Sequence, residues 1–146
     1  MYTIENSPGR WLSALHRYAQ SFICKRLRNY DIGSGQYIFL MELYKGDGKK
    51  QEELATALNI DKGTTAKALS NLEKHGYLTR ETDKDDKRAY RIFLTNKAFN
   101  VKPYIHQVLL EWTEIITSGL SEKEAETALD LLPKMAANAV SFDRKS

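Results

Sequence analysis

Apolar residues recur at helical spacing along most of the chain, and the first run predicts an amphipathic helix. Ser7-Pro8 is a start signal, because a serine hydroxyl caps free backbone N–H groups and proline is tolerated in the first helical turn. We expect this helix to span residues 8–30. Its apolar stripe consists of Trp11, Leu15, Ala19, Ile23 and Leu27.

Two shorter helices are predicted before residue 60. The first is largely apolar, begins at Ser34 and stops at Gly46-Asp47-Gly48, since glycines end helices. The second spans residues 51–58 and buries Leu54, Ala55 and Leu58.

A fourth helix is predicted over residues 62–75. Asp61 is its natural N-cap and Gly76 its C-terminal stop. Its apolar stripe consists of Ala66, Leu69 and Leu72, so the polar residues between them are expected to point away from the core.

A β-hairpin and two long helices complete the predicted architecture. Strands are expected over residues 77–81 and 90–94, joined by a charged turn. Thr95 begins a fifth helix that ends at Gly119, with Pro103 as a kink or as the start of its regular part. A capping box at Ser121 to Glu124 begins a sixth helix, which we expect to bend at Pro133. The fold class is therefore mainly α with a small β-hairpin wing.

The third and fourth helices are joined by about four residues, which is the arrangement of a helix-turn-helix. The second helix of such a unit enters the DNA major groove when its exposed side chains are short or cationic. A purely solvated helix face is the alternative. The predicted contacts from this helix are Lys62, Thr64, Thr65, Lys67, Ser70, Asn71 and Lys74, and Lys50 and Gln51 are expected to touch the DNA backbone from the third helix.

The hairpin adds a second candidate DNA contact. Asp86 and Arg88 are two residues apart, so they face the same side of a strand and the carboxylate can hold the guanidinium extended. An extended arginine fits a narrow minor groove. Lys84, Lys87 and Arg80 add positive charge to the same hairpin and are predicted to contact DNA as well. A charged turn that only keeps the hairpin solvated is the alternative.

Charge and composition support this interpretation and argue against other classes. The net charge is +3, with the basic excess in the middle of the chain and an acidic excess after residue 100. The single cysteine, Cys24, has no neighbours at metal-ligand spacing, so no disulfide, zinc site or cofactor is expected. No apolar run resembles a signal peptide or a membrane span, which predicts a cytoplasmic protein.

An enzyme is not expected. His16, His75 and His106 fall on three different predicted helices, and none of the common metalloprotease, phosphate-binding, nucleophile or dinucleotide motifs accompanies them. We therefore predict no catalytic residues.

The order of these elements resembles the MarR family of regulators. The most specific segments are Leu72-Glu73-Lys74-His75-Gly76-Tyr77-Leu78, Asp86-Lys87-Arg88 and Leu94-Thr95. The chain departs from the family pattern at Lys50, where many members have a capping Thr or Ser, and at Ala98, where glycine is frequent.

This resemblance implies one domain over residues 1–146. Residues 34–95 would form the winged helix-turn-helix, and residues 8–30 and 96–142 would form dimerisation helices. It also implies a homodimeric repressor that binds a pseudo-palindromic site in double-stranded DNA, with Arg88 in the minor groove and Asp86 orienting it.

The terminal helices support the implied dimer independently. They carry more apolar side chains than a small winged domain can cover, although packing on their own domain is the alternative. These side chains are Trp11, Leu12, Phe22, Trp112, Ile115, Leu129, Leu132, Val140 and Phe142.

Many members of the family sense small aromatic acids or phenols. Arg17 is the candidate partner for a carboxylate, and His16, Tyr37 and Met41 are candidate walls of an effector pocket. Core packing of Tyr37 and Met41 and solvation of Arg17 are the alternatives.

Two further readings stay open. Cysteine-based redox sensing is one, because Lys25 and Arg26 flank Cys24, although the family's sensing cysteine lies about three turns earlier. A winged helix used only for protein contacts is the other, and the basic and small polar residues of the fourth helix argue against it.

Overall fold

The computed structural model describes residues 1–146, and its first helix confirms the predicted start. Helix α1 spans Pro8–Leu27 and continues as a 3₁₀ turn, η1, over Arg28–Tyr30. The Ser7 hydroxyl accepts a hydrogen bond from the Arg10 backbone N–H at 3.4 Å. The predicted range is therefore helical throughout, with the last turn wound more tightly.

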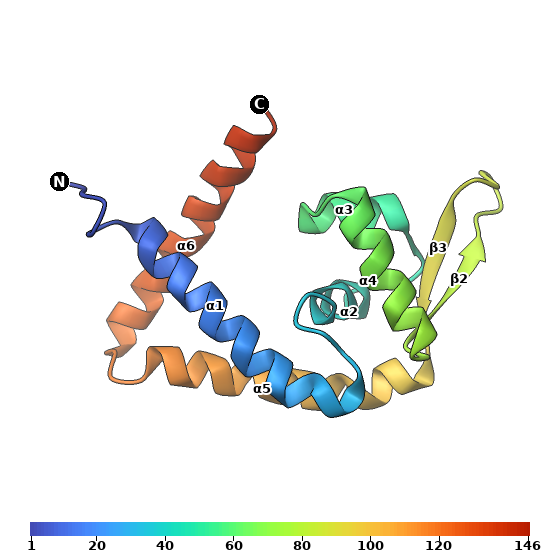
Figure 1. Ribbon diagram of the computed structural model, residues 1–146, viewed down its shortest axis with the longest axis horizontal. Coiled ribbons are helices and arrows are strands. Elements are labelled where there is room, and N and C mark those ends of the chain that lie inside the picture. Colours follow the sequence, from blue (N-terminus) through green and yellow to red (C-terminus); the bar gives the residue numbers. More distant parts are fainter. The chain divides into compact units, whose positions relative to one another are not determined.

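Three short helices follow α1, and the last two of them form the helix-turn-helix (Figure 1). The three are α2 (Tyr37–Tyr44), α3 (Gln51–Leu58) and α4 (Lys62–Lys74). Helix α2 begins later than predicted because the residues after Gly33 form a turn, in which the Gln36 N–H donates to the Gly33 carbonyl at 3.0 Å. Asn59 ends α3 in the left-handed region, at φ 52°, a conformation that asparagine tolerates better than most residues.

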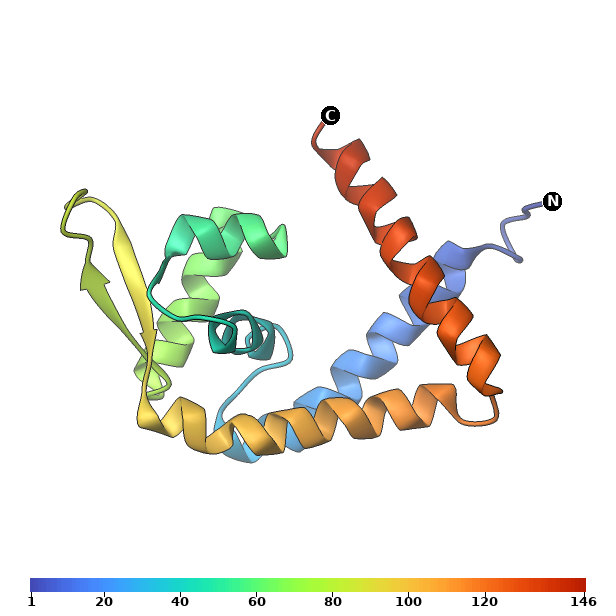
Figure 2. The same cartoon turned by 180° about the vertical axis from the view of Figure 1, so that it is seen from behind.

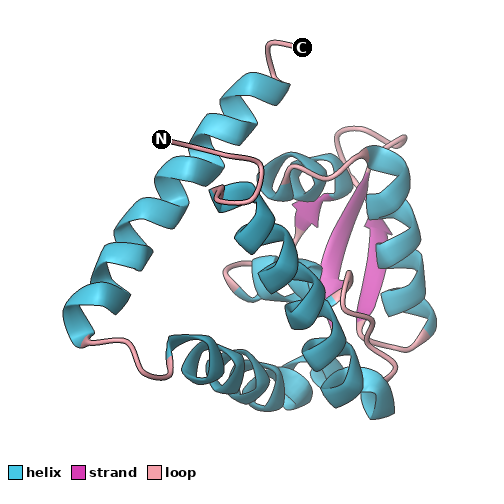
Figure 3. Ribbon diagram, turned by 60° about the vertical axis from the view of Figure 1, so that its left-hand side comes forward, coloured by secondary structure: helices cyan, strands magenta, loops and turns pink.

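The three strands form one antiparallel sheet in the order β1-β3-β2 (Figure 3). Strands β2 (Leu78–Thr82) and β3 (Tyr90–Leu94) are the predicted hairpin. Strand β1 (Lys49–Lys50) pairs with Ile92 and Arg91 of β3. We did not predict β1, because two residues are too few to show an alternating pattern. It ties the start of α3 to the hairpin.

The two long helices are α5 (Asn96–Thr117) and α6 (Glu122–Asp143). Pro103 lies within α5 and Pro133 within α6, and each helix continues past its proline. Pro103 therefore does not mark the start of α5. The Ser121 capping box is confirmed, since the Ser121 N–H donates to Glu124 Oε2 at 2.8 Å and the Glu124 N–H donates to Ser121 Oγ at 3.3 Å.

One hydrophobic core joins the N-terminal helix to the helix-turn-helix. The last turns of α1 lie along the first part of α5 (Figure 2), where Ile23 and Leu27 share the core with Ile105. The Tyr104 hydroxyl also donates to the Arg26 carbonyl at 3.0 Å. Ala98, one of the departures from the family pattern, is fully buried in this core. This core thereby holds α2, α3 and α4 against α1 and the first part of α5.

The chain forms two compact units, Met1–Leu109 and Leu110–Ser146. The boundary falls inside α5, and the single domain over residues 1–146 with its parts stays a prediction. None of the residues of α6 is buried. None of the helices has both the length and the apolar character needed to cross a membrane.

Candidate nucleic-acid interface

The start of α4 is fixed by Asp61, as predicted. Asp61 Oδ1 accepts from the Thr64 N–H at 2.8 Å, and Oδ2 accepts from the Thr64 hydroxyl at 2.7 Å. These bonds, from the backbone first and the hydroxyl second, lower the pKa of Asp61. Because its proton is given to Asp61, the exposed Thr64 hydroxyl offers only acceptor lone pairs to a ligand.

The inner face of α4 differs from the prediction at two positions. Thr65 is fully buried, so the expectation that it points away from the core is wrong. Ala66, expected in the core, is only half-buried. The buried stripe runs through Thr65, Ala68, Leu69 and Leu72, which is an equally good i, i+3, i+4, i+7 pattern. A small β-branched residue fits that stripe through its methyl group, and its hydroxyl led the sequence analysis to place it on the polar face.

The outer face of α4 carries the remaining predicted residues. Lys62, Thr64, Lys67, Ser70 and Lys74 are exposed. Asn71 is half-buried and donates through Nδ2 to Gln36 Oε1 at 2.8 Å, so it links α4 to the turn before α2. We did not predict this role for Gln36, and nothing in its sequence context indicates it. A shallow groove on this face is lined by Ala66, Lys67, Ser70, Asn71 and Lys74.

The hairpin and its turn, residues 78–94, are called the wing below. At its tip, the Arg88 side chain is 94% exposed. Its Nε lies 3.5 Å from Asp86 Oδ1, which also accepts from the Arg88 backbone N–H at 3.0 Å. Lys84 and Lys87 are exposed beside it. The wing therefore presents a group of cations to solvent, one of them next to a carboxylate.

The base of the wing turn, residues 83–89, where the turn joins β2 and β3, is held by a second aspartate. Asp83 Oδ1 accepts from the backbone N–H groups of Asp85 and Asp86, both at 2.9 Å, and Arg91 Nε donates to Oδ2. Led by the Asp86 N–H, these bonds lower the Asp83 pKa to about 2. Arg91 also donates to the Gly48 carbonyl at 2.9 Å.

The Asp83–Arg91 clamp at the base of the turn joins the wing to the loop before α3. The sequence reasoning missed it. The signal was present, since an aspartate followed by free backbone N–H groups is typical of an Asx turn.

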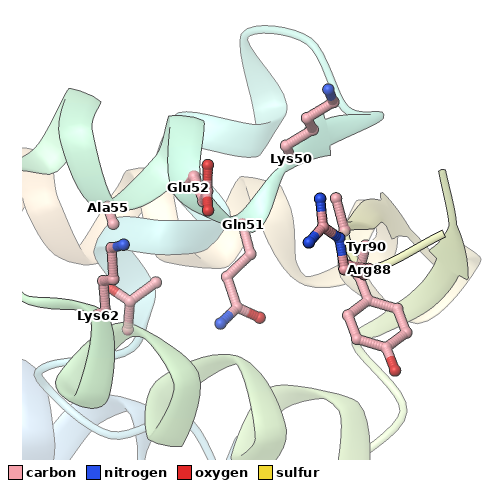
Figure 4. Close-up of a pocket in the computed structure, with 9 residues that line it drawn as sticks. Lys50, Gln51, Glu52, Ala55, Lys62, Arg88 and Tyr90 are labelled. Carbon is pink, nitrogen blue, oxygen red and sulfur yellow. The ribbon is translucent and has the colours of Figure 1, made fainter. Parts of the chain in front are cut away.

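A pocket of about 160 Å³ brings three of these segments together (Figure 4). Lys50 and Gln51 reach it from the start of α3, Lys62 from the start of α4, and Arg88 from the wing. Glu52 is the acidic side chain in its lining. Residues far apart in the sequence thus form one cationic surface between helix and wing. The lining is Lys50, Gln51, Glu52, Ala55, Lys62, Thr65, Arg88, Ala89 and Tyr90.

The start of α3 is capped in a different way from the family pattern. Lys50 has no side-chain acceptor to offer, and the Glu53 carboxylate instead accepts the Lys50 backbone N–H at 3.2 Å. The lysine side chain is thereby left to line the cationic pocket (Figure 4).

Arg80 lies differently from the other predicted contacts. Its side chain is 18% exposed. Its guanidinium donates to Ser70 Oγ at 2.8 Å and to Gln51 Oε1 at 3.3 Å. The wing strand β2 is thus linked through one side chain to both helices of the helix-turn-helix.

The four effector candidates fall into two pairs with different surroundings. Arg17 is exposed and donates to Ser13 on its own helix at 2.7 Å, and His16 lies 3.4 Å from Gln20. Tyr37 and Met41 are half-buried against the core, and burial raises the pKa of Tyr37. The effector pocket stays a prediction. Cys24 is half-buried on α1, which leaves the redox reading equally untested.

Comparison with known proteins identifies the architecture. The sequence model of the MarR family matches residues 32–90. The chain is 30% identical to an HTH-type transcriptional regulator of Bacillus subtilis, YybA, over 88% of this chain and 86% of that protein.

Solved structures agree. A MarR transcriptional regulator of Methanosarcina mazei is 41% identical and superposes with a TM-score of 0.87, over 92% of this chain and 96% of that one. A MarR family regulator of Listeria monocytogenes, crystallised with a 26-mer DNA, is 26% identical with a TM-score of 0.86, over 97% of this chain and 92% of that one. The winged helix-turn-helix with its long flanking helices, together with these similarities, shows that the chain belongs to the MarR family of transcriptional regulators, which are not enzymes.

Proposed function

We propose that the protein binds a pseudo-palindromic site in double-stranded DNA as a homodimer and represses transcription from it. In this proposal α4 enters the major groove and the wing reaches the adjacent minor groove. The observation that carries it is the cationic surface between the start of α3, the start of α4 and Arg88 (Figure 4). Phosphates supply most of the affinity for such a surface.

Base contacts are assigned to the outer face of α4. Lys67, Ser70 and Lys74 are exposed there, and lysine and serine side chains form hydrogen bonds with base edges in the major groove. The Arg88 side chain is 94% exposed, which leaves it free to enter a narrow minor groove.

A second copy of the chain accounts for apolar side chains that one chain leaves in solvent. On α6, Leu129 is 71% and Phe142 74% exposed, and on α1, Trp11 is 57% exposed. Large apolar side chains left exposed on each of these helices support a protein interface there. A symmetric dimer presents two copies of α4, which is why a pseudo-palindromic site is expected.

Repression and its release by a small aromatic acid or phenol complete the proposal, following the family resemblance. Arg17 is the proposed partner of the ligand carboxylate, beside His16, Tyr37 and Met41. We expect salicylate, titrated into a DNA complex, to lower DNA affinity in wild type and to have less effect in Arg17→Ala. Unchanged affinity in wild type would remove the ligand from the proposal while leaving DNA binding intact.

The decisive experiment is selection from duplexes with a random central segment, followed by binding of the enriched duplex across a salt series. We expect enrichment of a sequence with two-fold symmetry, bound by a species of twice the chain mass. The logarithm of affinity should fall steeply with the logarithm of salt concentration. Arg88→Ala should weaken binding more than Arg28→Ala, which removes the same charge from the exposed η1 turn. Weak binding to all sequences, with equal effects of both substitutions, would contradict the proposal.

A further inference from the structure

Arg80 occupies an unusual place between the two helices of the helix-turn-helix. It stands on β2, yet its guanidinium donates to Ser70 Oγ on α4 at 2.8 Å and to Gln51 Oε1 on α3 at 3.3 Å. Its Nε lies 3.6 Å from Glu73 Oε2, one turn after Ser70 on the same helix. Three side chains of the helix-turn-helix therefore surround one cation from the wing strand.

The chemistry of guanidinium restricts what its two neutral partners can do. Arginine carries N–H donors and no acceptor, so the oxygen of Gln51, and not its NH₂ group, must face Arg80. For the same reason the Ser70 hydroxyl accepts from Arg80 with a lone pair, and its own hydrogen points elsewhere. Both partners are thereby left with a donor for any further contact.

We propose that Arg80 is a positioning residue that sets the hydrogen-bond polarity of the DNA-contacting surface. It holds Ser70 as a donor to purine N7, an acceptor that adenine and guanine both present in the major groove. It holds the NH₂ group of Gln51 as a donor to a phosphate oxygen. The inference rests on the proposed function, and it reassigns Arg80, which we predicted from the sequence to contact DNA directly.

The exposure of Arg80 agrees with this role. A side chain that is 18% exposed and already bonded to two helices has little surface left for a phosphate. Arg88, at 94% exposed, differs in this respect. Arg80 therefore acts on DNA through Ser70 and Gln51 and does not depend on a direct contact.

The hydrogen bond between Arg80 and Ser70 is tested first in the protein without DNA. Arg80→Met keeps much of the side-chain length but removes every donor, and Ser70→Ala removes the acceptor. In urea unfolding we expect the double variant to lose less stability than the sum of the two single variants, because both remove one shared bond. Additive losses would show that the Arg80–Ser70 hydrogen bond between β2 and α4 does not contribute to stability, and would overturn the inference.

The polarity is tested with the duplex enriched by the random-sequence selection, with 7-deazapurine placed at one purine at a time. We expect one position in each half-site at which the lost N7 weakens wild-type binding roughly 5- to 30-fold. Ser70→Ala and Arg80→Met should both be insensitive at that position. Arg80→Lys, which retains a donor, should regain part of the sensitivity, which a mere loss of stability would not restore.

The salt dependence separates this role from a direct phosphate contact. Arg80→Met should leave the salt slope unchanged and affect a non-selected duplex by less than about twofold. A slope reduced by about 0.9, with equal weakening on every duplex, would make Arg80 a phosphate contact and overturn the inference alone. A selection that enriches nothing would end the proposed function and this inference together.

Discussion

The wing turn carries the same pair of residue types at its base, where it joins the strands, and at its tip, in opposite environments. At the base the Asp83 side chain is 1% exposed and bonded to Arg91. At the tip the Arg88 side chain is 94% exposed, 3.5 Å from Asp86. The base pair is surrounded by backbone N–H groups and a carbonyl, whereas the tip pair faces water.

Under the proposed function, this difference separates the residues that stabilise the hairpin from those that contact DNA. A buried carboxylate that accepts several hydrogen bonds contributes to folding, because removing it leaves its donors unsatisfied. An exposed pair contributes little to folding but remains free to meet a ligand. Gly48, whose carbonyl accepts from Arg91, has a φ of 78° and leaves only 3.1 Å between an added Cβ and the Phe93 ring. The side chains at the base are therefore held in place by hydrogen bonds, whereas those at the tip are exposed to solvent.

The largest expected effect is on stability, from Asp83→Ala. It leaves the N–H groups of Asp85 and Asp86 and the Arg91 side chain without their acceptor. We expect the melting temperature to fall by roughly 5 to 10 °C. Asp86→Ala in the same turn is the matched control and should change it by less than about 2 °C. Equal decreases in melting temperature would mean that the two aspartates contribute equally to stability, and would contradict the proposed difference between base and tip.

The second effect is on DNA affinity. Here the exposed Arg88 should matter more than Arg91, although Arg91 matters more for stability. Arg88→Ala should weaken binding to the selected duplex roughly tenfold without a change in melting temperature. Arg91→Ala should lower the melting temperature, because it breaks the bonds to Asp83 and Gly48. At a temperature where Arg91→Ala is fully folded, its affinity should stay closer to wild type than that of Arg88→Ala. A greater loss from Arg91→Ala would place the DNA contact at the base.

The same contrast explains how much of this site could be predicted from the sequence. Helix α4, the hairpin and the Asp86–Arg88 pair are local features, so spacing and capping residues indicated their ranges. The Asp83–Arg91 clamp depends on which loop lies beside the wing, and Gly48 is far from both in the sequence. No local pattern contains that information.

Thr65 and Arg80 illustrate a second limit. Thr65 has a hydroxyl, which suits a solvent-exposed face, and a methyl group, which suits the core. Only tertiary packing decides which of the two faces it occupies. Arg80 is a cation in a basic segment, and its pairing with Ser70 and Gln51 becomes visible only when β2 lies against both helices. At both positions the residue type showed which hydrogen bonds the side chain could form. The fold decided whether the side chain is buried and which partners it binds.

The third expected effect is acid sensitivity of the base. The folded pKa of Asp83 is about 2, below its ordinary value of 3.8. Its contribution to stability is therefore present above pH 3.8 and is lost as the pH falls through about 2. We expect the difference in melting temperature between wild type and Asp83→Asn to shrink over this range. The lowered pKa values of Glu42 and Asp61 affect both variants equally, so a constant difference would contradict the assignment.

The smallest expected effect concerns the carboxylate at the tip, in Asp86→Ala. If Asp86 only holds Arg88 extended, as the 3.0 Å bond to the Arg88 N–H and the 3.5 Å approach to its Nε suggest, its removal costs preorganisation and no direct contact. We expect a loss of affinity of roughly two- to fivefold in wild type, and none in an Arg88→Ala background. The double variant should therefore bind the selected duplex as weakly as Arg88→Ala alone. A gain in affinity would show instead that the negative charge of Asp86 repels the phosphates more than it helps Arg88, and would assign the tip aspartate a role against binding.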